Sequence, residues 1–204
     1  GVLGTEPTTP LPFLNAESLL YRKACPPGDR SMIISPTAMA SFANAVPTFF
    51  NPAATISDIW KTGKVSKGQG WEWYRSNSLY SHTAGSLVGT VTVTGANQSG
   101  STLSITTTNV GDTLKKGDKC SILNVNFVNP VTRRVIGAPQ VQHFTVLQDY
   151  TLTAGPDTIS IYPEIIGPGD QYQNVDALPA NGAALTLWPG TASPNGKVGT
   201  VGLG

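Results

Sequence analysis

The chain has 204 residues, a mass of 21.4 kDa and a formal net charge of +1, and charged residues make up 12% of it. That fraction is about half of the value for an ordinary soluble domain, and the 13 Lys and Arg residues are scattered, which argues against a nucleic-acid or membrane-surface protein. No apolar run is long enough to span a membrane, and Cys25 and Cys120 are too isolated to indicate a disulfide framework or a zinc site.

The first helix and strand are predicted between residues 14 and 35. Asn15 is a good N-cap acceptor, and Leu14 and Leu19 are spaced as a hydrophobic staple, so a helix is expected to run from Asn15 to about Cys25. The short apolar run within residues 31–35 then predicts a buried strand, because turn residues bound it on both sides.

Two more helices are predicted by the same device, a capping residue followed by proline. Ser35 caps the first, and Pro36 occupies a first turn where its missing N–H costs nothing. The apolar face of this helix comprises Met39, Phe42, Ala43 and Val46. The second helix is expected from a cap at Asn51 to a stop at Gly63.

Trp71 and Trp73 alternate with Glu72 and Tyr74, which predicts a strand with one aromatic face. Packing in a hydrophobic core is the simpler interpretation, because the two indoles follow the strand period. Paired tryptophans also suit stacking on sugar rings, so a carbohydrate-binding platform is the alternative hypothesis.

From Gly85 onward the pattern is entirely that of β-structure. Alternating Val, Leu, Ile and Thr residues predict a hairpin formed by 91–94 and 103–106. The inward-facing parity of the next strand flips near Leu123, which predicts a bulge or bend there, and Pro163 predicts an edge strand. The remaining strands are expected at 141–147, 158–165 and 184–188.

These patterns predict an α+β chain with a partial mixed α/β domain and a small antiparallel β-barrel of about six strands. The expected limits are residues 1–84 for the first part, 85–189 for the barrel and 190–204 for a segment that returns to the first part. Because the sequence lacks an initiator Met and both ends are rich in Gly, we expect a fragment of a longer protein.

No catalytic, metal or cofactor site is predicted. The two imidazoles are assigned structural roles, His82 in fixing the crossover between the two parts and His143 within a strand. Four aspartates each follow Gly or Pro, so turn geometry explains them: Asp112, Asp118, Asp157 and Asp170. The repeated Gly-Asp at 111–112 and 117–118 is interpreted as two turns.

Several segments, in their order along the chain, resemble tailed-phage major capsid (coat) proteins. The resemblance is to the branch of the Hong Kong ninety-seven-type shell fold that carries an inserted β-barrel. The segments are 31–38 (SMIISPTA), 50–53 (FNPA), 59–63 (IWKTG), 70–76 (GWEWYRS), 82–85 (HTAG), 115–119 (KKGDK), 129–132 (NPVT) and 144–146 (FTV).

The resemblance implies a structural subunit that assembles an icosahedral shell through subunit contacts, and neither an enzyme nor a cofactor-binding protein. Its expected partners are other copies of the coat protein and a scaffolding protein during assembly, with packaged DNA only an indirect partner and no membrane. The expected location is the capsid of the virion, assembled in the cytoplasm of the bacterial host. In this setting residues 1–84 would belong to the parent domain of the shell protein.

Two pairs of adjacent basic residues are candidate subunit contacts: Lys115, Lys116, Arg133 and Arg134. Ordinary solvated charges are the alternative interpretation of all four. The alternative function is an extracellular carbohydrate-binding or adhesin-type β module that uses Trp71, Trp73 or Trp188 as a stacking platform.

Overall fold

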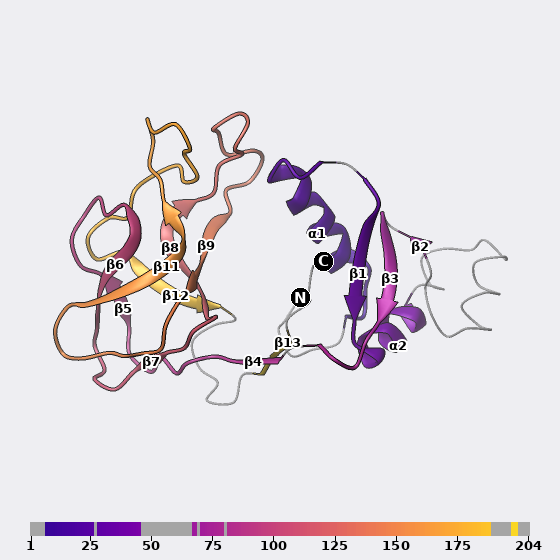
Figure 1. Ribbon diagram of the computed structural model, residues 1–204, viewed down its shortest axis with the longest axis horizontal. Coiled ribbons are helices and arrows are strands. Elements are labelled where there is room, and N and C mark those ends of the chain that lie inside the picture. The colour runs from indigo at the N-terminus through magenta and orange to yellow at the C-terminus, as the bar shows by residue number, and fades with distance from the viewer. Residues whose placement is uncertain are drawn as a thin grey trace. The chain divides into compact units, whose positions relative to one another are not determined.

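The computed structural model describes residues 7–26, 28–45, 67–68, 70–79, 81–188 and 197–199. The chain divides into two compact units (Figure 1). Unit 1 comprises Gly1–Ser81 and Val198–Gly204, and unit 2 comprises His82–Lys197. Unit 2 is therefore one continuous stretch, whereas unit 1 draws on residues from both sides of it.

Unit 1 contains two helices and a three-stranded sheet. Its elements are α1 (Leu11–Arg22), β1 (Arg30–Ile34), α2 (Pro36–Ala45), β2 (Lys67–Gly68) and β3 (Trp71–Arg75). The strand order is β1-β3-β2, with β1 parallel and β2 antiparallel to β3 (Figure 1). The strands β4 (Ser81–Thr83) and β13 (Lys197–Gly199), at the limits of the two units, pair as a separate sheet.

The start of α1 differs from the prediction. The helix begins at Leu11, and Pro10 occupies the N-cap position without a capping side chain. Pro10 and Pro12 favour this start because proline fixes a helical φ and needs no hydrogen-bond acceptor in a first turn. Asn15 consequently lies inside the helix, and its predicted capping role is wrong.

The strand and helix that follow agree with the sequence analysis. Met32 and Ile34 of β1 are buried, and Ser35 Oγ accepts a hydrogen bond from the Ala38 amide at 3.1 Å, so Ser35 caps α2 as predicted. Met39 and Phe42 are each only 1% exposed. The helix predicted at 51–63, together with Val46, lies outside the described residues.

The two tryptophans of β3 form the centre of the unit 1 core. Trp71 is 1% and Trp73 3% exposed, and the Trp73 ring packs against Phe13 and Phe42 with centroid distances of 4.7 and 4.8 Å. Their indole N–H groups donate to the carbonyl oxygens of Phe13 and Gly68. This burial makes the sugar-stacking hypothesis wrong for Trp71 and Trp73; the side chain of Trp188 lies outside the described residues.

Unit 2 is built on a closed antiparallel barrel, which confirms the predicted fold class (Figure 1). The strand order is β11-β6-β5-β12-β8-β9, and every neighbouring pair is antiparallel. The strands are β5 (Val91–Val93), β6 (Gly100–Thr107), β8 (Lys119–Asn126), β9 (Val141–Val146), β11 (Asp157–Ile165) and β12 (Ala184–Trp188). Alternate residues point inward and form one apolar core.

The predicted bulge near Leu123 is confirmed. Ser121 pairs with His143, but the next pair along the strands is Asn126 with Val141, so β8 holds extra residues between these pairs. Asn124 adopts a φ of 63°, and the inward side changes from Ile122 to Val125 across this point.

Pro163 marks a bulge and not the predicted edge. The strand β11 has partners on both sides, β6 and β9. Its register against β6 shifts between Ser160 and Ile165, so proline lies where a ladder hydrogen bond is already missing.

Unit 2 also contains a small two-stranded sheet, β7 (Thr113–Leu114) with β10 (Tyr150–Thr151). This sheet was not predicted because two-residue strands leave no periodic pattern.

Candidate functional site

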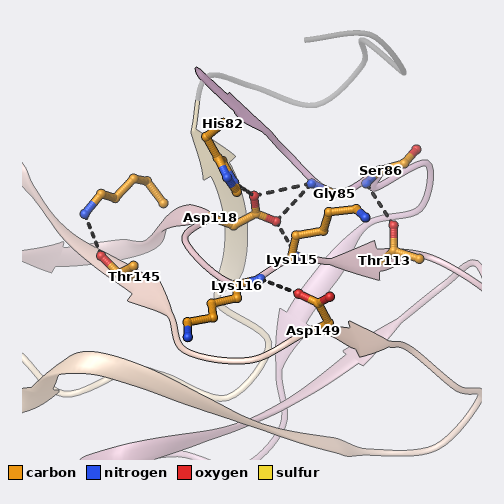
Figure 2. A network of polar contacts seen from close by, with 10 residues as sticks. His82, Gly85, Ser86, Thr113, Lys115, Lys116, Asp118, Thr145 and Asp149 are labelled. Carbon is orange, nitrogen blue, oxygen red and sulfur yellow. Dashed lines mark hydrogen bonds and ion pairs between the residues drawn. The ribbon is translucent and has the colours of Figure 1, made fainter. Parts of the chain in front are cut away.

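A polar network centred on Asp118 lies at the beginning of unit 2 (Figure 2). The Asp118 side chain has no exposed surface and accepts a hydrogen bond from Nε2 of His82 at 2.7 Å. It also accepts the backbone N–H groups of Gly85 at 3.0 Å and Lys115 at 2.7 Å. A buried carboxylate is stable only when such donors replace water, and this one has donors on several sides.

The turn between β7 and β8 places Asp118 in this position. Gly117 has a φ of 96°, which L side chains rarely adopt, and a Cβ there would lie 3.3 Å from Cε1 of His82. The amide of Lys116 donates to Oδ1 of Asp149 at 2.7 Å, so a second carboxylate fixes the same turn (Figure 2).

Asp112, the residue before β7, binds the backbone of residues 88 and 89. It is 2% exposed and accepts the amides of Val88 at 2.9 Å and Gly89 at 3.1 Å. The Thr107 hydroxyl and the Asn109 side-chain amide also donate to it, at 2.7 and 2.8 Å. Burial alone raises the pKa of the Asp112 carboxyl, but the four hydrogen bonds together outweigh burial and lower it.

Residues 82–89, here called the strap, lie along the segment 112–118 between these two aspartates. Midway, Thr113 donates its amide to the Ser86 carbonyl at 2.9 Å, and its hydroxyl accepts the Ser86 amide at 3.1 Å. The strap approaches β7 so closely that a Cβ on Gly85 would clash with the Thr113 carbonyl oxygen. Only glycine fits at that position.

The four candidate contact residues occupy two different loops of unit 2. Lys115 and Lys116 lie on the β7–β8 turn, and Arg133 and Arg134 lie on the loop between β8 and β9. All four are exposed, and none of them forms an ion pair with another described residue. The arginine loop is also fixed locally, because Asn129 Oδ1 accepts the amides at 131 and 132.

The structure extends the predicted role of His82 and revises the description of the turn aspartates. His82 does bond to the segment that follows the crossover, through Asp118. The burial of Asp112 and Asp118 was not predicted, although the repeated Gly-Asp was a visible sign of two equivalent tight turns.

The described part of the chain contains no group of three or more potential metal ligands, and none of its helices is long and apolar enough to cross a membrane. Cys120 is fully buried in the barrel, and burial raises the pKa of its thiol to about 12. This thiol is therefore protonated at neutral pH and is a poor nucleophile.

Comparison with known proteins identifies the family. The sequence matches the family described as P22 coat protein, gene protein 5, over residues 13–195, which includes most of both units. The chain belongs to the P22 coat protein family. As a member of a phage coat protein family, it is a structural subunit of the virion capsid.

Among solved structures, this coat protein is similar to the CUS-3 coat protein I-domain. The sequences are 29% identical, the match covers 49% of this chain and 96% of that chain, and the TM-score is 0.36. No curated protein matches the sequence.

Proposed function

We propose that this coat protein has the Hong Kong ninety-seven-type shell fold and builds the icosahedral capsid of a tailed phage. The observation that carries the proposal is the family match over residues 13–195. In this role the protein acts through repeated contacts between identical subunits and has no enzymatic activity.

The domain arrangement belongs to the same proposal. Residues 1–84 are assigned to the parent (axial) domain, 85–189 to an inserted barrel and 190–204 to the return segment. The continuity of unit 2 supports this assignment, because unit 1 includes residues that precede and follow it. An insertion requires that pattern.

The proposed partners are other copies of the coat protein, with a scaffolding protein during assembly in the host cytoplasm. Packaged DNA is only an indirect partner. The test is to co-express the gene product that contains this chain with its scaffolding protein and to examine the product by electron microscopy. Closed particles are expected, whereas soluble monomers alone would contradict the proposal.

The two basic pairs are the proposed subunit contacts. All four side chains are exposed, and their loops are fixed by Asp118, Asp149 and Asn129, so little backbone freedom is lost when a neighbour binds. We expect a neighbouring copy to supply carboxylates to these cations. An exposed charge that forms no ion pair within its own subunit breaks no existing ion pair when it binds an opposite charge.

Charge reversal tests this assignment. The double variants Lys115→Glu/Lys116→Glu and Arg133→Glu/Arg134→Glu should lower the yield of particles without changing the urea midpoint of the free subunit. The matched control is Lys119→Glu, an exposed lysine of the same unit whose Nζ already donates to Thr145 Oγ1 at 2.6 Å. Normal assembly of both double variants would remove these residues from the interface.

A further inference from the structure

The repeated Gly-Asp at 111–112 and 117–118 forms two matched ties on one segment of the chain. Gly111 and Gly117 have φ values of 95° and 96°, and the aspartates that follow them are 2% and 1% exposed. Each aspartate accepts backbone N–H groups from the strap: Asp118 from Gly85, and Asp112 from residues 88 and 89. Both Gly-Asp pairs therefore bind the backbone of the strap, residues 82–89.

The two aspartates differ in whether their hydrogen bonds include a residue of a barrel strand. Asp112 also binds Thr107, the last residue of the barrel strand β6, and Asn109. Asp118 binds His82 and Gly85 of the strap and, besides these, the amide of Lys115 in its own turn. Loss of the Asp112 tie therefore disturbs the barrel wall, whereas loss of the Asp118 tie disturbs the strap and one turn.

The burial of the strap follows the same division. Leu87, next to the residues held by Asp112, is 6% exposed and belongs to the barrel core. Residues 82–86 include no fully buried side chain, although Ala84 packs partly against the core. Detachment of this first part exposes little apolar surface, so polar contacts dominate its free energy, and these include the hydrogen bonds to Asp118 and the bonds between Ser86 and Thr113.

The first part of the strap also includes a strand at the limit of unit 2. His82 belongs to β4, which pairs with β13, the strand by which the chain leaves this unit. The bond from His82 to Asp118 therefore links the β4–β13 pair, where the chain enters and leaves unit 2, to the β7–β8 turn.

We propose that the strap is a releasable clasp. Its first part, residues 82–86, detaches at Asp118 as one step, while the second part stays bound to Asp112 and the barrel remains folded. The clasp provides a hinge point at the boundary of unit 2 that opens without global unfolding.

Amide hydrogen exchange of the full chain, followed by NMR in wild type, Asp118→Asn, His82→Ala and Asp112→Asn, tests the clasp. Asp118→Asn should speed the exchange of the Gly85 and Lys115 amides by about ten-fold or more, because both lose a charged acceptor. Amides of the barrel strands β5, β6 and β12 should keep their wild-type rates. His82→Ala should produce a smaller increase at Gly85, and Asp112→Asn should speed exchange throughout the barrel.

The matched control is Asp149→Asn, which removes the carboxylate that accepts the Lys116 amide of the same turn but leaves the strap contacts in place. It should speed exchange at Lys116 and leave Gly85 unchanged. A uniform increase across the barrel in both Asp118→Asn and His82→Ala would overturn the proposal, since the strap would then open only by global unfolding. Unchanged exchange at Gly85 in Asp118→Asn would overturn it as well.

Discussion

The hydroxyl of Thr107 donates to Oδ2 of Asp112 at 2.7 Å, and both residues are buried in unit 2. The bond joins the end of β6 to the beginning of β7 and completes a set of four donors around one carboxylate. These four donors stabilise the ionised form of Asp112, so protonation of this carboxyl lowers the stability of the folded state.

The lowered pKa of Asp112 predicts loss of stability in acid. Because the folded pKa lies below the unfolded value of about 4, the contribution is fully present above that value and is lost as the pH falls through it toward the folded pKa. Urea unfolding of wild type and Asp112→Asn measures this. The variant should have a free energy of unfolding about 2 kcal/mol lower at pH 7 and should show a weaker decline as the pH falls below about 4. Parallel pH curves for the two proteins would contradict the assignment.

Substitution of Gly70 should destabilise unit 1. Gly70 has a φ of +78°, and a Cβ there would lie 2.5 Å from Oε1 of Glu17. Gly70→Ala should therefore cost about 1–2 kcal/mol, measured as the urea midpoint followed by tryptophan fluorescence, since both described tryptophan side chains lie in this unit. Gly28→Ala is the matched control, because nothing lies within 4 Å of its Cβ position and its φ is not positive. Equal midpoints for the two variants would show that the contact is unimportant.

The two cysteines should differ in reactivity toward a disulfide reagent. Cys120 is fully buried with a pKa of about 12, whereas Cys25 is partly exposed. The native protein should release one equivalent of the chromophore rapidly and a second only after addition of denaturant. Cys25→Ser should abolish the rapid phase; a rapid phase that persists in this variant would show that the barrel opens around Cys120.

Adjacent strands of the barrel offer a matched pair for core packing. Phe144 on β9 is 0% exposed, and Tyr162 on the neighbouring β11 is 67% exposed. Phe144→Ala should lower the free energy of unfolding by about 3–5 kcal/mol, whereas Tyr162→Ala should change it by about 0.5 kcal/mol or less. A large effect of Tyr162→Ala on the isolated chain would mean that this face of the barrel is covered.

The barrel could be predicted because, apart from the bulges, its strands alternate between buried and more exposed positions. Ile159 and Ile161 obey this alternation, and the change of parity near Leu123 located a bulge that the register confirms. The start of α1 could not be predicted in the same way. The capping chemistry of Asn15 and the φ preference of two prolines compete there, and the prolines determine the outcome.

The hydrogen-bond partners of the buried aspartates could not be predicted from local sequence patterns. Asp112 and Val88 are 24 residues apart, and Asp118 and Gly85 are 33 apart, so no periodicity or turn rule relates them. Sequence established that Asp112 and Asp118 occupy turns. Only the folded backbone shows that those turns face one segment and enclose its amides.

Closure of the barrel has a consequence for a protein that works at very high local concentration. Each of its six strands has a hydrogen-bonded neighbour on both sides, so the barrel wall has no edge strand. Copies crowded into a shell cannot extend one another's barrels by strand addition, which is a route to amyloid-like aggregation in open sheets. Any contact between the barrels of two copies would therefore form through side chains and loops and not through backbone pairing between strands.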